Sequence, residues 1–130
     1  MKITTLVENS LAEGHADLTA EFGLSLCIEH AGRCILFDTG AAGVAMRNAE
    51  RLGIDLARVD AVVLSHHHFD HGGGLPAFFA VNGHAKVFLR HPPEGKEYFR
   101  ALLVVSRYIG LEEGLLERHE DRFVFVDHDP

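Results

Sequence analysis

Basic residues are scarce in this 130-residue chain, which has 12 lysines and arginines against 19 aspartates and glutamates, a formal net charge of −7. Nucleic-acid binding rests largely on lysine and arginine contacts with phosphates, so this balance argues against a nucleic-acid partner. The chain also lacks the run of about 18 apolar residues that a membrane-spanning helix needs, which argues against a membrane protein. Hydrophobic residues still make up 47% of the sequence, enough for one globular core.

Cysteine is rare as well, with Cys27 and Cys34 as the two in the chain. Two cysteines are too few for a disulfide framework. A bridge between them is conceivable, but we expect two reduced, packed thiols. The opening residues, "MKITTLVENS", lack the apolar run of a secretory signal peptide. These features favour a soluble cytoplasmic domain.

Short apolar runs alternate with helical segments along the chain. We expect strands at 2–8, 60–65, 85–91 and 122–130, and a hairpin within 23–40 that turns at Ala31-Gly32. We expect helices at 42–52 (closed by Gly53), at 75–83, from about Glu94 to 110, and at 111–121. Asp55 is expected to cap a short helical turn after the first helix.

Pairing across the hairpin turn makes both of its faces largely apolar. One face carries Leu24, Leu26, Ile28, Ile35 and Phe37, and the other carries Cys27, Cys34 and Leu36. A sheet that is apolar on both faces has to be covered on both sides. Because an antiparallel hairpin precedes alternating strands and helices, the expected fold is α/β with a mixed sheet.

Four histidines and an aspartate lie within the six residues 66–71, between an apolar strand and three glycines. Imidazole and carboxylate groups are common ligands of zinc, iron and manganese. His66 and His68 lie at the end of an extended strand and point the same way, so that one ion can bind both, whereas His67 points away. Asp70 and His71 follow a bend and can form a second position. Two ions about 3.5–4 Å apart can share a bridging hydroxide.

Other residues are candidates around this predicted two-metal site. Gly72, Gly73 and Gly74 are expected to let the backbone turn sharply and pass close to ions or substrate. Asp38, in "LFDTG" at a strand end, is the best candidate to hold the ligand rings in place. Glu8 and Asn9 end the first strand and could face a substrate, although a solvated strand end is an equal alternative.

The motif "SHHHFDH" resembles the H-x-H-x-D-H signature of the metallo-β-lactamase superfamily, and "ILFDTG" is similar to the strand-end aspartate upstream of it. Further segments resemble the dihydropterin ribofuranosyl-aminobenzene phosphate synthase-like subfamily: "TTLVENS", "EFGLSLCIEH", "NAERLGID", "VDAVVLSHHHFDHGGGL" and "RHPPEG". The resemblance implies an αββα sandwich of two similar halves that bind two metal ions between them. Residues 1–130 correspond to its first half, a mixed sheet covered by helices, and are expected to form one incomplete domain.

The resemblance also implies roles for individual residues. His66 and His68 would bind the first ion, and Asp70 and His71 the second. Asp70 would have a catalytic role by orienting a metal-bound hydroxide, and Asp38 would support the ligand loop. The family takes a third histidine, a bridging carboxylate and a last histidine from its second half, and these have no clear match here.

The histidines outside the cluster are weaker candidates for the missing ligands. We expect His84 and His119 to be exposed in polar surroundings. His91 follows a strand end, where it could line a pocket. His128 lies near the end of the chain and could be an accidental ligand.

The leading function is a metal-dependent hydrolase that uses a metal-bound hydroxide on an ester, a phosphoester or a related small molecule, which we expect to be anionic. Two divalent ions are expected, with zinc first and iron or manganese as alternatives. The chain has no Gly-x-Ser-x-Gly motif for a serine nucleophile. The alternative is a metal-binding half-domain that self-associates, most simply as a homodimer, without turnover. A weaker redox alternative follows from the di-iron sites of some family members, but no flavin-binding domain accompanies the motif.

Overall fold

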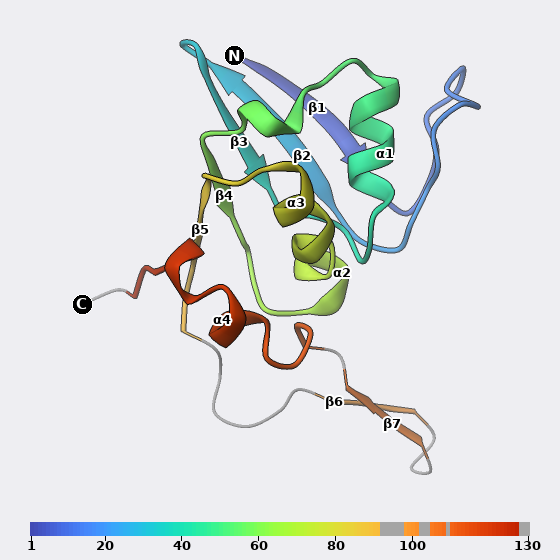
Figure 1. Cartoon of the computed structure of the whole chain (residues 1–130). Coiled ribbons are helices and arrows are strands. Elements are labelled where there is room, and N and C mark those ends of the chain that lie inside the picture. Colours follow the sequence, from blue (N-terminus) through green and yellow to red (C-terminus); the bar gives the residue numbers. More distant parts are fainter. Residues whose placement is uncertain (92–97, 102–104, 109, 128–130) are drawn as a thin grey trace.

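A six-stranded mixed sheet organises the computed structural model, which describes residues 1–91, 98–101, 105–108 and 110–127 (Figure 1). The strand order is β1-β2-β3-β4-β5-β8. The strands are β1 (Lys2–Val7), β2 (Ser25–His30), β3 (Arg33–Phe37), β4 (Ala61–Val63), β5 (Lys86–Leu89) and β8 (Phe123–Phe125). The pairs β1–β2 and β2–β3 are antiparallel, and the pairs from β3 to β8 are parallel. The predicted mixed α/β sheet is therefore confirmed, although the single strands are shorter than predicted.

The hairpin of β2 and β3 turns at Ala31-Gly32, as predicted. Both turn residues have positive φ, 49° for Ala31 and 75° for Gly32, as a two-residue type I′ turn requires. The register places Leu26 opposite Phe37 and Cys27 opposite Leu36. The predicted division of the hairpin into two apolar faces is confirmed.

The helices are short. They are α1 (Val44–Arg51), η1 (Leu56–Arg58), α2 (Phe69–Gly72), α3 (Leu75–Val81), α4 (Leu115–Arg118) and η2 (Glu120–Arg122). Gly53 follows α1 with a φ of 73°, and Asp55 caps η1 by accepting a hydrogen bond from the Ala57 backbone N–H at 3.0 Å, both as predicted. Among the described residues, no helix combines the length and the apolar character needed to cross a bilayer.

The predicted helices in the last third of the chain are largely wrong. In place of a helix from about Glu94 to 110, the described residues form a hairpin of β6 (Tyr98–Ala101) and β7 (Val105–Tyr108). Glu94 itself lies outside the described residues. Aromatic residues and valines are frequent in 98–108, and these side chains favour strands. The predicted helix at 111–121 is reduced to α4 and η2, because Gly114 adopts a φ of 79° that a continuing helix excludes.

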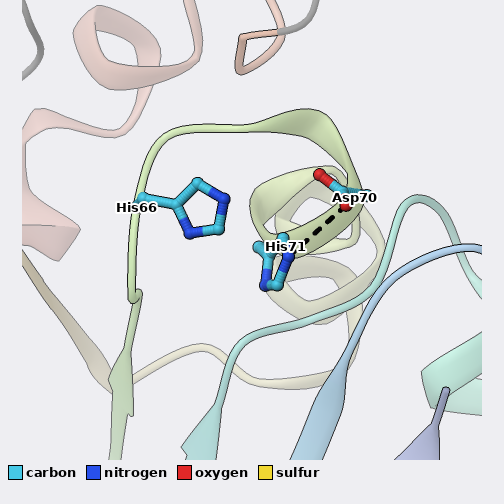
Figure 2. A group of neighbouring side chains, drawn as sticks. All are labelled: His66, Asp70 and His71. Carbon is cyan, nitrogen blue, oxygen red and sulfur yellow. Dashed lines mark ion pairs between the residues drawn. The ribbon is translucent and has the colours of Figure 1, made fainter.

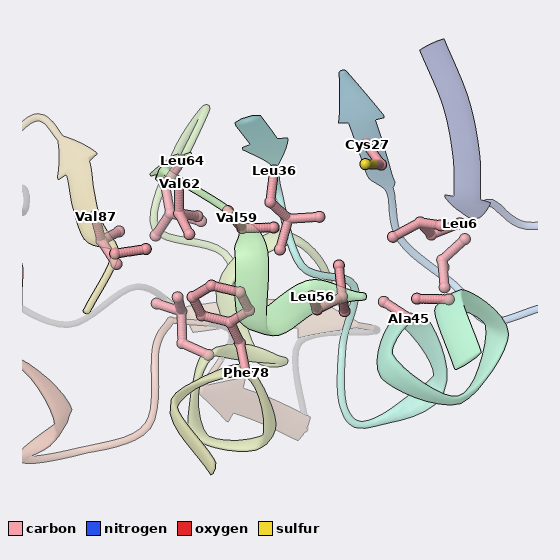
Figure 3. Close-up of a cluster of buried hydrophobic side chains, with 14 of the residues drawn as sticks. Leu6, Cys27, Leu36, Ala45, Leu56, Val59, Val62, Leu64, Phe78 and Val87 are labelled. Carbon is pink, nitrogen blue, oxygen red and sulfur yellow. The ribbon is translucent and has the colours of Figure 1, made fainter. Parts of the chain in front are cut away.

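The hydrophobic core lies on one face of the main sheet, between the strands and helices α1 and α3 (Figure 3). Cys27, Leu36, Val62 and Val87 point from four neighbouring strands into this core and are fully buried. Phe78 of α3 packs among them. This packing fixes the ends of β3 and β4, where the candidate site lies.

The opposite face of the sheet, which we call the outer sheet face, is apolar but only half-buried. It carries Leu26, Ile28, Ile35, Phe37, Val63 and Phe88. Ile3, opposite Ile28 on the edge strand, is 54% exposed. The sequence predicts covering on both sides, whereas the described helices pack their buried side chains into the core on the other face.

The two thiols lie side by side in the hairpin without a disulfide bond. The Sγ atoms of Cys27 and Cys34 are 3.4 Å apart, and both cysteines are free, as predicted. Burial raises the pKa of Cys27 to about 12, and burial is also the main cause that raises the pKa of Cys34.

The raised pKa values of Cys27 and Cys34 predict slow alkylation of the native thiols. The thiolate is the reactive form, so labelling by iodoacetamide should be slow at about pH 7.5 and should accelerate as the pH rises toward about 10. Unfolding in guanidinium should make both thiols react quickly. The mass of the protein after timed labelling measures this, and rapid labelling of the native chain at neutral pH would contradict it.

Candidate metal centre

The end of β4 and the one-turn helix α2 bring three of the predicted ligands together. His66 follows β4, and Asp70 and His71 lie on α2, with the two imidazole rings facing one another (Figure 2). One ligand atom from each of the three residues lies within 4.8 Å of the others. The ring centroids of His66 and His71 are 4.2 Å apart, and Nε2 of His71 is 3.4 Å from Oδ2 of Asp70. Two imidazoles and one carboxylate are a donor set that fits zinc, iron or manganese.

The neighbouring histidines follow the end of β4 and differ in their surroundings. The ring of His68 lies beside the group, with its centroid 4.6 Å from that of His66. His67 is turned the other way, is 9% exposed, and has Nε2 at 2.7 Å from the carbonyl oxygen of Arg90. The structure therefore groups His66 with Asp70 and His71, with His68 adjacent, while His67 has a structural contact instead.

Asp38 lies behind the ligands and is fully buried. It follows β3, which is the parallel neighbour of β4, so the carboxyl ends of both strands meet at one edge of the sheet. Oδ2 of Asp38 is 2.7 Å from Nδ1 of His71 and accepts a hydrogen bond from Oγ of Ser65 at 2.6 Å. Oδ1 accepts a second hydrogen bond from the Ser65 backbone N–H at 2.8 Å. The contact with Nδ1 leaves Nε2 of His71 directed toward Asp70, where an ion could bind.

The glycines after the motif are required by close packing more than by the turn itself. Gly73 and Gly74 form the predicted turn, between α2 and α3, but their φ values of −66° and −81° are ones that any residue can adopt. A Cβ atom on Gly73 would lie 2.2 Å from the carbonyl oxygen of Ala41, and one on Gly74 would lie 2.2 Å from that of Thr39. The glycines therefore allow the backbone around Thr39 to pack directly against the ligand helix.

Two residues of this site were not predicted from the sequence. Ser65 contacts both Asp38 and His66, with Oγ 2.8 Å from Nδ1 of His66. Thr39 donates to the carbonyl oxygen of His71 from its backbone N–H at 2.6 Å and from Oγ1 at 2.9 Å. Both residues are direct sequence neighbours of a predicted site residue, and a hydroxyl in that position is the signal that could have identified them.

The predicted pocket residues lie outside the converging group. Oε1 of Glu8 accepts a hydrogen bond from Ser10 at 2.5 Å. Oδ1 of Asn9 accepts one from the Gly23 backbone N–H at 2.9 Å. Asn9 therefore joins the loop after β1 to the segment before β2.

Among the remaining histidines, His91 pairs through Nδ1 with Asp127 and stacks on Phe125. His84 is exposed, as predicted. The predicted exposure of His119 is wrong, because its ring packs on Phe79 at a centroid distance of 4.6 Å and is half-buried. His128 lies outside the described residues.

Partial desolvation of the largely exposed ring is the main cause that lowers the pKa of His66 below its ordinary value of 6.5, and the neighbouring His71 and His68 lower it further. Metal ions bind neutral imidazole, so protons compete with the ion. Because the pKa of His66 is lowered, we expect zinc affinity to hold down to about pH 6.5 and to fall between there and about pH 5. Calorimetric titration at several pH values measures this. Full affinity at about pH 4.5 would show that carboxylates, and not these histidines, bind the ion.

Comparison with known proteins places this site in a family. Residues 18–126 match the family model of the metallo-beta-lactamase superfamily. An uncharacterised protein of Methanocaldococcus jannaschii is 33% identical over 118 residues, which cover 88% of this chain and 42% of that protein. The 7,8-dihydropterin-6-methyl-4-(beta-D-ribofuranosyl)-aminobenzene-5'-phosphate synthase of the same organism is 37% identical over 83 residues, which cover 57% of this chain and 28% of the synthase.

A solved structure agrees with the fold. Tm1679, a metal-dependent hydrolase of the beta-lactamase superfamily, superposes with a TM-score of 0.70 at 28% identity, over 97% of this chain and 42% of Tm1679. This chain therefore spans less than half the length of each of these three proteins. With the sheet, the helices and the His/Asp cluster described above, these matches show that the chain belongs to the metallo-beta-lactamase superfamily.

Proposed function

We propose that this chain carries the metal-ligand motif of a metal-dependent hydrolase that acts on an ester, a phosphoester or a related anionic small molecule. The observation that carries this proposal is the convergence of His66, Asp70 and His71, with one ligand atom from each within 4.8 Å of the others. Membership of a superfamily that includes the metal-dependent hydrolase Tm1679 supports hydrolysis in general.

We propose two ion positions, held by His66 and His68 and by Asp70 and His71, with zinc as the first choice and iron or manganese as alternatives. Divalent ions in such a site polarise the substrate and lower the pKa of a water molecule. The residues of this chain hold and orient the ligand side chains and the attacking water. Asp38 fixes the ring of His71 through Nδ1. We propose that the Asp70 carboxylate also accepts a hydrogen bond from the attacking water and so directs it toward the substrate.

A second candidate function is self-association without turnover, and the outer sheet face favours it. Leu26, Ile28 and Phe37 lie half-buried on this face, and Ile3 beside them is 54% exposed. Contiguous apolar surface of this kind marks interaction sites. A pair of chains related by a two-fold axis, each covering the outer sheet face of the other, would bury it.

The two candidates are separated by turnover and mass measured on the same preparations. The zinc- or manganese-loaded chain is assayed with bis(p-nitrophenyl) phosphate and p-nitrophenyl acetate, and its mass is measured by light scattering. Asp70→Asn should abolish turnover, whereas His84→Ala, at an exposed position away from the site, should not change it. Metal-loaded dimers without turnover would favour the second candidate, and failure to bind metal would refute both.

A further inference from the structure

Ser65 lies between the buried Asp38 carboxylate and the imidazole of His66. Its Oγ is 2.6 Å from Oδ2 of Asp38 and 2.8 Å from Nδ1 of His66. Its backbone N–H donates to Oδ1 of Asp38 at 2.8 Å, which fixes the position of the serine relative to the carboxylate. The hydroxyl therefore has two close partners in a site whose geometry is set by the backbone.

The number of protons available decides the direction of these hydrogen bonds. A serine hydroxyl has one proton to donate, and a carboxylate offers only acceptor sites. The hydroxyl proton of Ser65 must therefore point to Asp38. Its oxygen is then left as the acceptor for Nδ1 of His66, so that Nδ1 carries the proton of the neutral ring.

The Asp38 carboxylate also determines which ring nitrogen of His71 carries the proton, and it does so by direct contact. Oδ2 of Asp38 is 2.7 Å from Nδ1 of His71, which must be the donor in that contact. A neutral imidazole carries one N–H, and a proton on Nδ1 leaves the lone pair on Nε2 free to bind an ion. Asp38 thus acts on His71 by contact and on His66 through Ser65.

We propose that Ser65 is a positioning residue, which holds His66 as the Nδ1–H tautomer and so presents its Nε2 for metal binding. The consequence for metal rests on the proposed ligation by His66. The tautomer can be measured without any metal, so failure of this inference and failure of the proposed function are distinguishable.

The direct test is nuclear magnetic resonance on the metal-free protein with ¹⁵N-labelled histidine, at a pH where the ring is neutral. Long-range ¹H–¹⁵N correlations report which ring nitrogen carries the proton, and a His66→Gln variant assigns the signals. We expect His66 to be the Nδ1–H form in the wild type. In Ser65→Ala its signals should shift toward the Nε2–H form, and Ser65→Thr, which keeps the hydroxyl, should restore them.

The controls separate positioning from a general loss of structure. His71 should keep its Nδ1–H form in Ser65→Ala, because its contact with Asp38 is direct. Ser10→Ala removes an exposed hydroxyl that bonds Glu8 and should leave both rings unchanged. A His66 proton on Nε2 in the wild type, or an unchanged tautomer in Ser65→Ala, would overturn the inference.

Metal binding gives a second readout. Groups that orient a metal-ligating histidine typically contribute about 10–100-fold to affinity. Ser65→Ala should therefore weaken cobalt binding by about that factor. The visible spectrum of the bound cobalt ion measures the binding. Ser65→Thr should return the affinity close to that of the wild type. Equal affinities in the wild type and Ser65→Ala would refute the proposed consequence for metal binding.

Discussion

Replacing Asp38 with alanine should remove metal binding and destabilise the fold in the same variant. The carboxylate is fully buried, accepts two hydrogen bonds from Ser65 and faces Nδ1 of His71. Each buried donor left without an acceptor costs about 1–3 kcal/mol. The residue also has a φ of 55°, a conformation in which alanine is less favourable than aspartate or asparagine. We expect a loss of about 3–5 kcal/mol in the free energy of unfolding, measured by denaturant titration of the metal-free chain.

Two further variants give this prediction its controls. Asp38→Asn tolerates the backbone conformation, so it should lose less stability than Asp38→Ala. It should still bind zinc poorly, because an amide group cannot accept from all of the donors around it. Asp60→Ala removes an exposed carboxylate that accepts from the Cys34 backbone N–H, and it should leave zinc affinity unchanged. Equal losses in Asp38→Ala and Asp60→Ala would contradict a special role for Asp38.

Alanine at positions 66 and 67 should have opposite effects on metal binding and stability. His66 is exposed and belongs to the converging group, so His66→Ala should lower zinc affinity by more than about 100-fold, beyond what loss of a supporting group costs. The stability of its metal-free form should change by about 0.5 kcal/mol or less. His67 is buried against the carbonyl oxygen of Arg90, so His67→Ala should keep its zinc affinity and lose about 1–3 kcal/mol.

Calorimetric zinc titration measures the affinity, and denaturant titration measures the stability, of the wild type, His66→Ala and His67→Ala. His68→Ala is expected to lose affinity as well, since its ring lies beside that of His66. Equal metal loss in the His66, His67 and His68 variants would refute the division of these neighbours into ligands and a structural residue. Retained affinity in His66→Ala would refute the ligand assignment itself.

Local sequence patterns predicted much of the fold. The Ala31-Gly32 turn, the glycine after α1 and the cap at Asp55 depend on residues close in sequence, and each is present. The strand alternation expected at His66 and His68 is absent, because β4 ends at Val63. Helix α2 has four residues, too few for a helical period to show. The hairpin of β6 and β7 differs from the predicted helix because the aromatic residues and valines of this segment favour strands.

The contacts of Ser65 could not be predicted from the sequence for a related reason. Ser65 and Asp38 are 27 residues apart. They meet because β3 and β4 are parallel neighbours, paired through Phe37 and Val63. The sequence contains both strands but does not give their order in the sheet. A serine before a histidine motif has no evident partner until that order is known.

The close packing around Gly73 and Gly74 has a thermodynamic consequence. Backbone hydrogen bonds, which need no ion, join the loops around the site: Thr39 donates to His71, Leu24 to Asp70, and Gly74 to Gly40. The conformational entropy of these loops is therefore lost when the chain folds and not when an ion binds. Metal binding to this chain should show little of the unfavourable entropy of a site that orders on binding, and the loop amides should exchange with solvent as slowly as those of the neighbouring strands.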